Sequence, residues 1–338
     1  MRKGIIAAGN WIIDQVKTID RWPKEGELCN ILSVEQSGGG GPCNVLFDLA
    51  ALTDRIPLYA AGALGDDDNG LWLQHECDRR KIDRRYLQCR PGQVTSFTDV
   101  MSGDGRRTFF HCCGANAGLG YPELAAIEVE AGIFYLGYLL LLAKLDGSDP
   151  DYGTPAARLL DDFRRRGCLT VVDFVSEAPE KFRRVVNAAL PHIDVLVVNE
   201  LEAGNTFGVA VRDADNGLIP GALRAVARRF LAAGVRQGVV IHMPEGAVVL
   251  TADGDFLCRP SCDVPRREIV GTNGAGDAFC AGILYGLHEG LCWEETLRLA
   301  SASAAFNLKH ATANGGAVEL AVLQRYLQDC RWSPAFPA

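Results

Sequence analysis

The chain has 338 residues, of which 48% are hydrophobic and 22% charged, a globular composition long enough for one large α/β domain or two smaller ones. Its formal net charge of −8 and pI near 5.3 argue against nucleic acid as the main partner, because phosphate backbones are bound by clustered cationic surfaces. No stretch approaches 18 consecutive apolar residues, so no membrane-spanning helix and no membrane partner are predicted.

The cysteine pattern and the first residues bear on the cellular compartment. The twelve cysteines are scattered, with no CxxC pair and no Cys/His spacing that suits zinc, so we expect reduced thiols. The apolar run near the start is short, carries Asn10 and Asp14, and lacks a cleavage site of small residues, unlike a secretory signal. We therefore expect a soluble, cytoplasmic protein.

Short apolar runs rich in β-branched residues alternate with helical patterns along the chain. In chain order, strands are expected at 4–9, 57–64, 133–139, 169–174, 194–199 and 238–243, and helices between them include 42–52, 156–167 and 221–234. Strands this apolar need both faces covered, which predicts a mainly parallel central sheet between two helical layers. Ligands of such three-layer α/β/α sandwiches bind at the carboxyl ends of the strands.

Two segments, about 11–36 and 94–113, follow a different pattern, in which polar and apolar residues alternate. The second contains a hairpin turn at 102–105. We expect the two segments to form a small antiparallel sheet inserted into the main domain, where it would act as a lid over the binding cleft. No internal repeat or linker interrupts the chain, so residues 1–338 are predicted to form one domain with that appendage.

The stretch from Gly271 to Gly282, GTNGAGDAFCAG, suggests a chemical function. Gly274 and Gly276 allow a tight backbone turn at the start of a helix expected over about 275–287, whose free amides would point at one spot. A helix N-terminus receives anions, and the carboxylate of Asp277 in its first turn can reach an attacking hydroxyl. The pattern indicates phosphoryl transfer to an alcohol, whereas the alternative is a glycine-containing helix cap with an acidic residue that matches the dipole.

These residues and three further motifs resemble the ribokinase-like, or PfkB-type, family of carbohydrate kinases over nearly the whole chain. Besides the stretch at 271–282, they are SGGGGPCNVLFDLAAL with the following AAGALGDDDNG, DGRRTFFHCCGANAGL, and the Asn-x-x-Glu motif NELE, at 37–52, 60–70, 104–119 and 199–202. The resemblance implies a ribokinase-like sandwich with a β-sheet lid, and an ATP- and Mg²⁺-dependent carbohydrate kinase.

The resemblance also implies a role for particular positions. Asp277 would be the catalytic base, and the amides of Gly274, Ala275 and Gly276 would bind the phosphoryl group in transit. Residues that would grip the sugar are Asp14, Gly39, Gly40 and Asn44. A carboxylate accepts hydrogen bonds from two vicinal hydroxyls, and glycines let sugar oxygens meet backbone amides. Without the resemblance, the residues favour a turn residue at Asp14 and a flexible connector at 38–41.

The nucleotide side of the site is implied by four further residues. Asn199 and Glu202 would lie by the magnesium ion and the phosphates, with Glu202 as the metal residue, because Mg²⁺ keeps most of its waters and needs few carboxylates. The alternative for this pair is a helix cap followed by an acidic first turn. Gly246 would approach the nucleotide, and Ser301 would face adenine.

Two departures from the family pattern affect the expected cofactors. Gly271 stands where the family often has an aspartate that helps to bind a monovalent cation, so activation by K⁺ is questionable. His242, Met243 and Pro244 replace a Thr-x-Gly sequence, which leaves the phosphate donor less well defined. We interpret His242 as a packed residue at a strand end, because no carboxylate partner is apparent in the sequence.

The acceptor is not identified by these motifs, since the family's acceptors include hexoses, pentoses, sugar acids, sugar phosphates and nucleosides. Arg106 and Arg107 are expected to face solvent, which disfavours a phosphorylated acceptor. We expect transfer to a hydroxymethyl group of a neutral sugar or polyol, with a nucleoside kinase or a catalytically silent sugar sensor as alternatives. Apolar lid residues are interpreted as lid packing, although they also suit a pocket lining or a homodimer contact through the lid: Phe97, Met101, Phe109 and Phe110.

Overall fold

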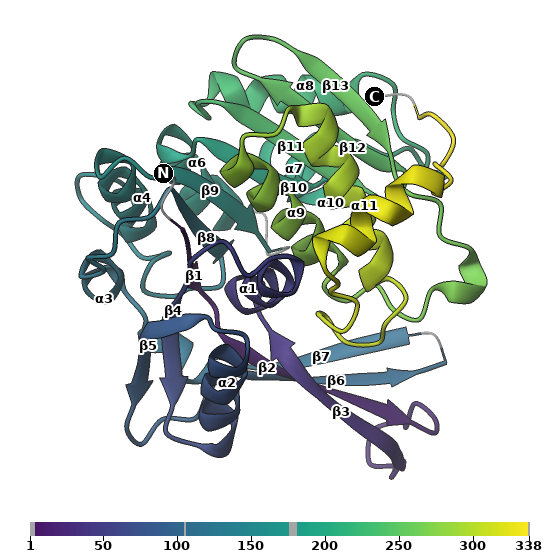
Figure 1. The fold of residues 1–338 in the computed structure, drawn as a ribbon. Coiled ribbons are helices and arrows are strands. Elements are labelled where there is room, and N and C mark those ends of the chain that lie inside the picture. The colour runs from purple at the N-terminus through teal and green to yellow at the C-terminus, as the bar shows by residue number, and fades with distance from the viewer. Residues whose placement is uncertain (1–3, 105, 176–180, 337–338) are drawn as a thin grey trace.

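A computed structural model describes residues 4–104, 106–175 and 181–336, and it consists of a large sheet between two helical layers with a small sheet projecting from one end (Figure 1). The large sheet contains β1 (Ile5–Gly9), β4 (Leu58–Gly65), β5 (Asp83–Arg90), β8 (Ile133–Leu139), β9 (Leu169–Phe174), β10 (Val195–Asn199), β11 (Gly238–Met243), β12 (Gly246–Thr251) and β13 (Phe256–Pro260). Their order is β13-β12-β11-β10-β9-β8-β1-β4-β5, and only β12 and β13 run antiparallel to their neighbours. The predicted fold class is therefore confirmed.

The helices divide between the two faces of this sheet because alternate strand residues point to opposite sides. Ile6, Phe134 and Leu196 pack with one helical layer, whereas Ile5, Tyr135 and Val195 pack with the other. The first layer contains α3 (Tyr121–Ala125), α4 (Pro155–Arg165), α6 (Asn187–Ala189), α7 (Glu200–Phe207) and α8 (Ala222–Ala232). The second contains α1 (Gly41–Leu52), α2 (Asp68–Arg79), α9 (Ala275–Glu289), α10 (Trp293–Asn307) and α11 (Leu320–Asp329).

The small sheet consists of β2 (Ile12–Ile19), β3 (Ile31–Gly39), β6 (Phe97–Gly103) and β7 (Arg106–Cys112), in the order β3-β2-β6-β7. It comes from the two segments predicted for the lid, but the prediction of a purely antiparallel sheet is wrong. β2 and β6 pair in parallel, with Asp14 opposite Thr98, because each segment forms its own hairpin and the two hairpins join through strands of the same direction. Of the expected turn at 102–105, residue 105 lies outside the described residues.

The six strands predicted for the large sheet agree with the observed strands to within one residue at each end. The helix expected over 42–52 is observed as Gly41–Leu52, and the one expected over 275–287 as Ala275–Glu289. No helix among the described residues is long and apolar enough to cross a membrane.

Candidate active site

The carboxyl ends of β1, β8, β9, β10 and β11 lie along one edge of the large sheet, and α9 begins at the same edge. Gly274 precedes this helix in a left-handed conformation, with φ 75° and ψ 0°. A Cβ atom at Gly274 would lie 2.1 Å from the carbonyl oxygen of Ala313, so the backbone at 313 packs directly on this glycine. No described side chain caps the start of α9, although the amide of Ala275 makes a long bond, 3.4 Å, to the carbonyl of Thr272. The first turn of α9 therefore keeps the uncapped geometry with which a helix N-terminus can bind an anion.

Asp277 lies in this first turn with only 6% of its surface exposed. Both of its carboxylate oxygens accept hydrogen bonds. The side-chain amide of Asn44 donates to Oδ2 over 2.8 Å, and the hydroxyl of Tyr138 donates to Oδ1 over 2.7 Å. Burial raises the pKa of Asp277 to about 6, and these two hydrogen bonds oppose the rise. A buried carboxylate that titrates near neutral pH is suited to accept a proton from an alcohol.

Asp14 approaches the same site from β2 of the small sheet, and Gly39, at the end of β3, packs on its carboxyl group. A Cβ atom at Gly39 would lie 2.5 Å from Cγ of Asp14, so no side chain fits there. Burial raises the pKa of Asp14 to about 7, a hydrogen bond from Asn273 opposes the rise, and the negative charge of Asp277 adds to it. The predicted residues Asp14, Gly39, Asn44 and Asp277 therefore come together from segments far apart in the sequence, with Gly40 between β3 and α1.

A cavity of about 510 Å³ lies on the other side of the α9 start. Its lining includes five of the predicted site residues, namely Asn199, Gly246, Ala275, Gly276 and Ser301. Apolar side chains such as Met243, Val264 and Phe279 form much of the rest, and a volume of this size can hold a nucleotide base and sugar. The cavity thus connects the predicted nucleotide residues with the start of α9, which was predicted to bind the phosphoryl group.

Glu202 is not among the residues that line this cavity. It forms a reciprocal cap with Asn199, in which Oδ1 of Asn199 accepts from the Glu202 amide over 2.8 Å and Oε2 of Glu202 accepts from the Asn199 amide over 3.1 Å. The alternative interpretation of this pair, a helix cap, is thus observed. The described residues contain no group of three or more His, Cys, Asp or Glu side chains arranged to hold a metal ion.

Three residues at this edge were not identified from the sequence. Tyr138 and Asp173 lie at or near the ends of β8 and β9, and their position at carboxyl ends of predicted strands was a usable signal. Burial raises the pKa of Asp173 well above its usual range, and the charges of Glu202 and Asp277 add to the effect. Asn314 donates to Oδ1 of Asn44 over 3.1 Å from a loop after α10, and no sequence pattern marks it.

His242 lies at the end of β11 and packs against Phe279, with 5.1 Å between the ring centroids. A Cβ atom at Gly276 would lie 3.3 Å from Cε1 of His242, so the ring also borders the anion-binding turn. Burial lowers the pKa of His242 to about 4, which keeps the ring neutral. It is a packed strand-end residue, and it also lines the cavity of about 510 Å³.

Two expectations for the lid side chains are corrected by the structure. Arg107 is half-buried, and one of its terminal nitrogens lies 3.1 Å from the point where a Cβ atom at Gly271 would stand, whereas Arg106 is exposed as expected. Phe109 and Phe110 are 59% and 58% exposed, so they do not pack within the lid. Successive strand residues point to opposite faces, so β7 is uncovered on both faces of the small sheet at this point.

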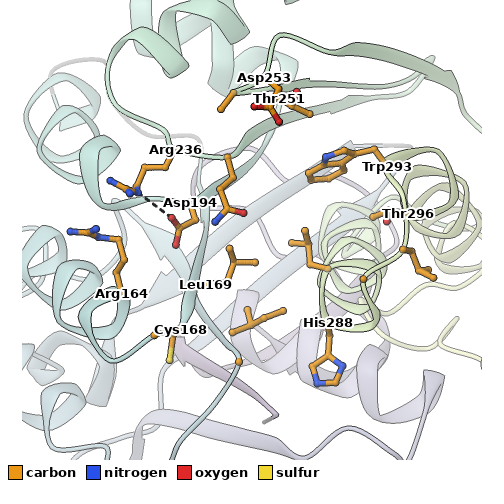
Figure 2. Close-up of a pocket in the computed structure, with 18 of the residues that line it drawn as sticks. Arg164, Cys168, Leu169, Asp194, Arg236, Thr251, Asp253, His288, Trp293 and Thr296 are labelled. Carbon is orange, nitrogen blue, oxygen red and sulfur yellow. Dashed lines mark ion pairs between the residues drawn. The ribbon is translucent and has the colours of Figure 1, made fainter. Parts of the chain in front are cut away.

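A second hollow, shown in Figure 2, lies at the opposite edge of the sheet. It has a volume of about 980 Å³ and is lined by residues that precede or begin strands, such as Leu169 and Asp194, together with Trp293 from α10. No predicted site residue lines it. Its cations are engaged by acids, as in the pair between Arg236 and Asp194 at 3.4 Å. Chemistry rather than volume therefore identifies the candidate site.

Comparisons with known proteins show which family the chain belongs to. The model of the pfkB family of carbohydrate kinases matches residues 4–319. The chain is 39% identical to the aminoimidazole riboside kinase of Salmonella typhimurium over 269 residues, which cover 77% of this chain and 76% of that protein. It is 26% identical to the ribokinase of Arabidopsis thaliana over 304 residues, which cover 89% of this chain and 74% of that one.

A solved structure of Arabidopsis thaliana ribokinase, in complex with ribose and ATP, superimposes with a TM-score of 0.79 at 22% identity and covers 97% of this chain and 100% of that one. With a family model over almost the full length and a relative at 39% identity, the chain belongs to the pfkB family of carbohydrate kinases and is an ATP-using kinase.

Proposed function

We propose that the protein transfers the γ-phosphoryl group of ATP to the hydroxymethyl group of a ribose-type sugar, either free or as a riboside. The observation that carries the proposal is the buried carboxylate of Asp277 at the uncapped start of α9, beside Asp14 on one side and the nucleotide cavity on the other. Two of its relatives are a ribokinase and a riboside kinase by name, which supports a ribose-type acceptor.

The proposed reaction follows from these positions. Asp14 accepts hydrogen bonds from ring hydroxyls, and Asp277 accepts the proton of the attacking hydroxymethyl group. The new bond forms between that oxygen and the γ-phosphorus while the bond to the β-phosphate oxygen breaks, so ADP leaves. The amides of the α9 start stabilise the charge of the phosphoryl group in transit. Burial of the site excludes water as a competing acceptor.

A magnesium ion suits the acids at this edge. Burial raises the pKa of Asp173, the negative charges of Glu202 and Asp277 raise it further, and a divalent cation would offset that charge. Glu202 would hold the ion, with water completing its coordination, as is usual for Mg²⁺. When bound, the ion would neutralise charge on the phosphates of ATP.

The experiment is a panel of acceptors with ATP and magnesium, in which ADP release is measured. The panel contains D-ribose, D-fructose, aminoimidazole riboside, inosine, adenosine, ribitol and ribose 1-phosphate. Turnover with ribose or a riboside supports the proposal, and turnover with purine nucleosides alone favours the nucleoside kinase. Thermal stabilisation by a panel member without ADP release favours a silent sugar sensor.

Asp277→Asn tests the role of the base in the same assay. We expect turnover to fall by about two to four orders of magnitude, because general base catalysis contributes that much, while acceptor binding is retained. Thermal shift by the acceptor serves as the control for folding and binding. Unchanged turnover would remove Asp277 from the mechanism.

We also propose that the protein is a homodimer whose two copies contact each other through the small sheet. Leu32 and Val34 on the edge strand β3 are 66% and 58% exposed, and Phe109 and Phe110 are exposed on β7 at the other edge. Exposed apolar edge strands offer unpaired backbone groups to a second copy of the chain.

A further inference from the structure

Tyr138, which the sequence did not single out, contacts the proposed catalytic carboxylate about as closely as Asn44 does. Its hydroxyl lies 2.7 Å from Oδ1 of Asp277 and donates to it. Its ring packs on the start of α1, where a Cβ atom at Gly41 would lie 2.9 Å from Cε1 of the tyrosine. The side chain therefore fills the space between the glycine-rich turn and Asp277.

The carboxylate of Asp277 is held from two elements at once. Tyr138 on the β8 side donates to Oδ1, and Asn44 on α1 donates to Oδ2. The amide of Asn44 is itself oriented, because its oxygen accepts from Asn314 over 3.1 Å and only its nitrogen can then face Asp277. With one donor on each oxygen the carboxylate plane is fixed, and each oxygen still has a lone pair for an acceptor hydroxyl.

We propose that Tyr138 is a positioning residue for phosphoryl transfer, whose hydroxyl orients Asp277 and favours its ionised form before the acceptor binds. The inference rests on the proposed role of Asp277 as the base. It adds a group that acts on the base rather than on the substrate.

The surroundings of Asp277 explain why such a donor is needed. Asp277 is surrounded by titratable groups from five elements, and its charge affects the pKa of each of them. They are Asp14 on β2, Cys43 and Asp48 on α1, Tyr135 and Tyr138 on β8, Asp173 on β9, and Cys280 on α9. None of these groups is a cation. Burial and the charge of Asp277 raise the pKa of the Tyr138 phenol well above its usual range, so it remains a donor.

Removal of the hydroxyl should change the acidity of Asp277 in a defined direction. A hydrogen bond to the ionised form lowers the pKa of a carboxyl group, so Tyr138→Phe should raise the pKa of Asp277 from about 6 by about one pH unit or more. Tyr135→Phe is the matched control. It removes the same group from the same strand, and the Tyr135 hydroxyl has no hydrogen bond to Asp277 among the described residues.

The first measurement needs no acceptor. Protein labelled with ¹³C at the aspartate carboxyl carbon is titrated by NMR, and the Asp277 and Asp14 resonances are assigned from their loss in Asp277→Asn and Asp14→Asn. We expect the Asp277 midpoint to move upward in Tyr138→Phe and to stay within about 0.3 pH units of wild type in Tyr135→Phe. Equal midpoints in wild type and Tyr138→Phe would overturn the inference.

The second measurement follows kcat/KM against pH with the panel acceptor that turns over fastest. The acid limb should move with the NMR midpoint, so the wild-type to Tyr138→Phe rate ratio should fall about tenfold between pH 5 and pH 8.5. If Asp277→Asn is inactive but Tyr138→Phe has the same pH profile as Tyr135→Phe, the inference about Tyr138 is wrong while the proposed base stands. If Asp277→Asn retains full turnover, the proposed base fails instead.

Discussion

The close packing of Gly274 against residue 313 predicts that this glycine cannot be replaced without loss of both stability and catalysis. In Gly274→Ala the new Cβ would lie 2.1 Å from the carbonyl oxygen of Ala313 and 2.5 Å from its Cα atom, so the backbone on one side has to shift by about 1 Å. The anion-binding turn is one of these two segments.

Gly221 provides a matched control for this substitution. It precedes α8 with φ 76° and ψ −7°, almost the conformation of Gly274, and no atom lies within 4 Å of its Cβ position. Gly221→Ala therefore measures the left-handed backbone cost by itself, about 1–2 kcal/mol. Gly274→Ala should cost about 1–3 kcal/mol more, because overpacking adds to that cost.

The assay is equilibrium unfolding in urea for the wild type and both variants, followed by kcat with the best panel acceptor. We expect turnover of Gly274→Ala to fall by up to about 10²-fold, as displacements near 1 Å can do, and turnover of Gly221→Ala to match the wild type. Equal destabilisation of the two variants with full turnover in Gly274→Ala would refute the reasoning. The contact with residue 313 would then place no constraint on the turn.

Two further predictions concern a buried acid and the lid. Asp48 in α1 is buried with neither carboxyl oxygen hydrogen-bonded among the described residues, and burial raises its pKa well above the usual range. Because the folded-state pKa is raised, the folded protein is most stable with Asp48 protonated: this contribution to stability is fully present below about pH 4 and is lost as the pH rises towards the folded-state pKa. Asparagine stays neutral at every pH. Asp48→Asn should therefore raise the urea midpoint at pH 8 and much less at pH 5. A parallel pH dependence in both proteins would contradict this. Val34→Lys on β3 should convert a lid-mediated dimer to a monomer in light scattering, whereas Leu71→Lys, at a 52% exposed position on α2, should not. A wild-type monomer at every concentration would exclude the lid dimer.

The central strands were predictable because they are buried on both faces and therefore read as continuous apolar runs with β-branched residues. Pairing within the lid was not, since an alternating pattern defines which face is buried but not which strand lies next to it. β2 and β6 are more than 75 residues apart in the sequence, and their parallel pairing depends on the three-dimensional path of the chain.

In the candidate site, too, local sequence patterns identified some residues, whereas contacts between distant segments were not predictable. Asp14, Asn44 and Asp277 were found through motifs, and the anion-binding turn also follows from glycine and helix chemistry. The groups that hold Asp277 in place depend on contacts between distant segments, such as residues 44, 138 and 314, which no local pattern reveals. Tyr138 and Asp173, in contrast, are indicated by the rule that ligands bind at the carboxyl ends of parallel strands.

The two acids at the centre of the site belong to different parts of the molecule. Asp14 is on β2 of the small sheet, and Asp277 is on a helix that packs on the large one. An outward swing of the small sheet would carry Asp14 away and relieve the repulsion that the charge of Asp277 exerts on it. A sugar whose hydroxyls donate hydrogen bonds to both acids would offset this repulsion and favour the position in which Asp14 lies near Asp277. The acceptor itself would then drive closure, and bound ATP alone would leave the site open and its phosphates away from a completed catalytic arrangement.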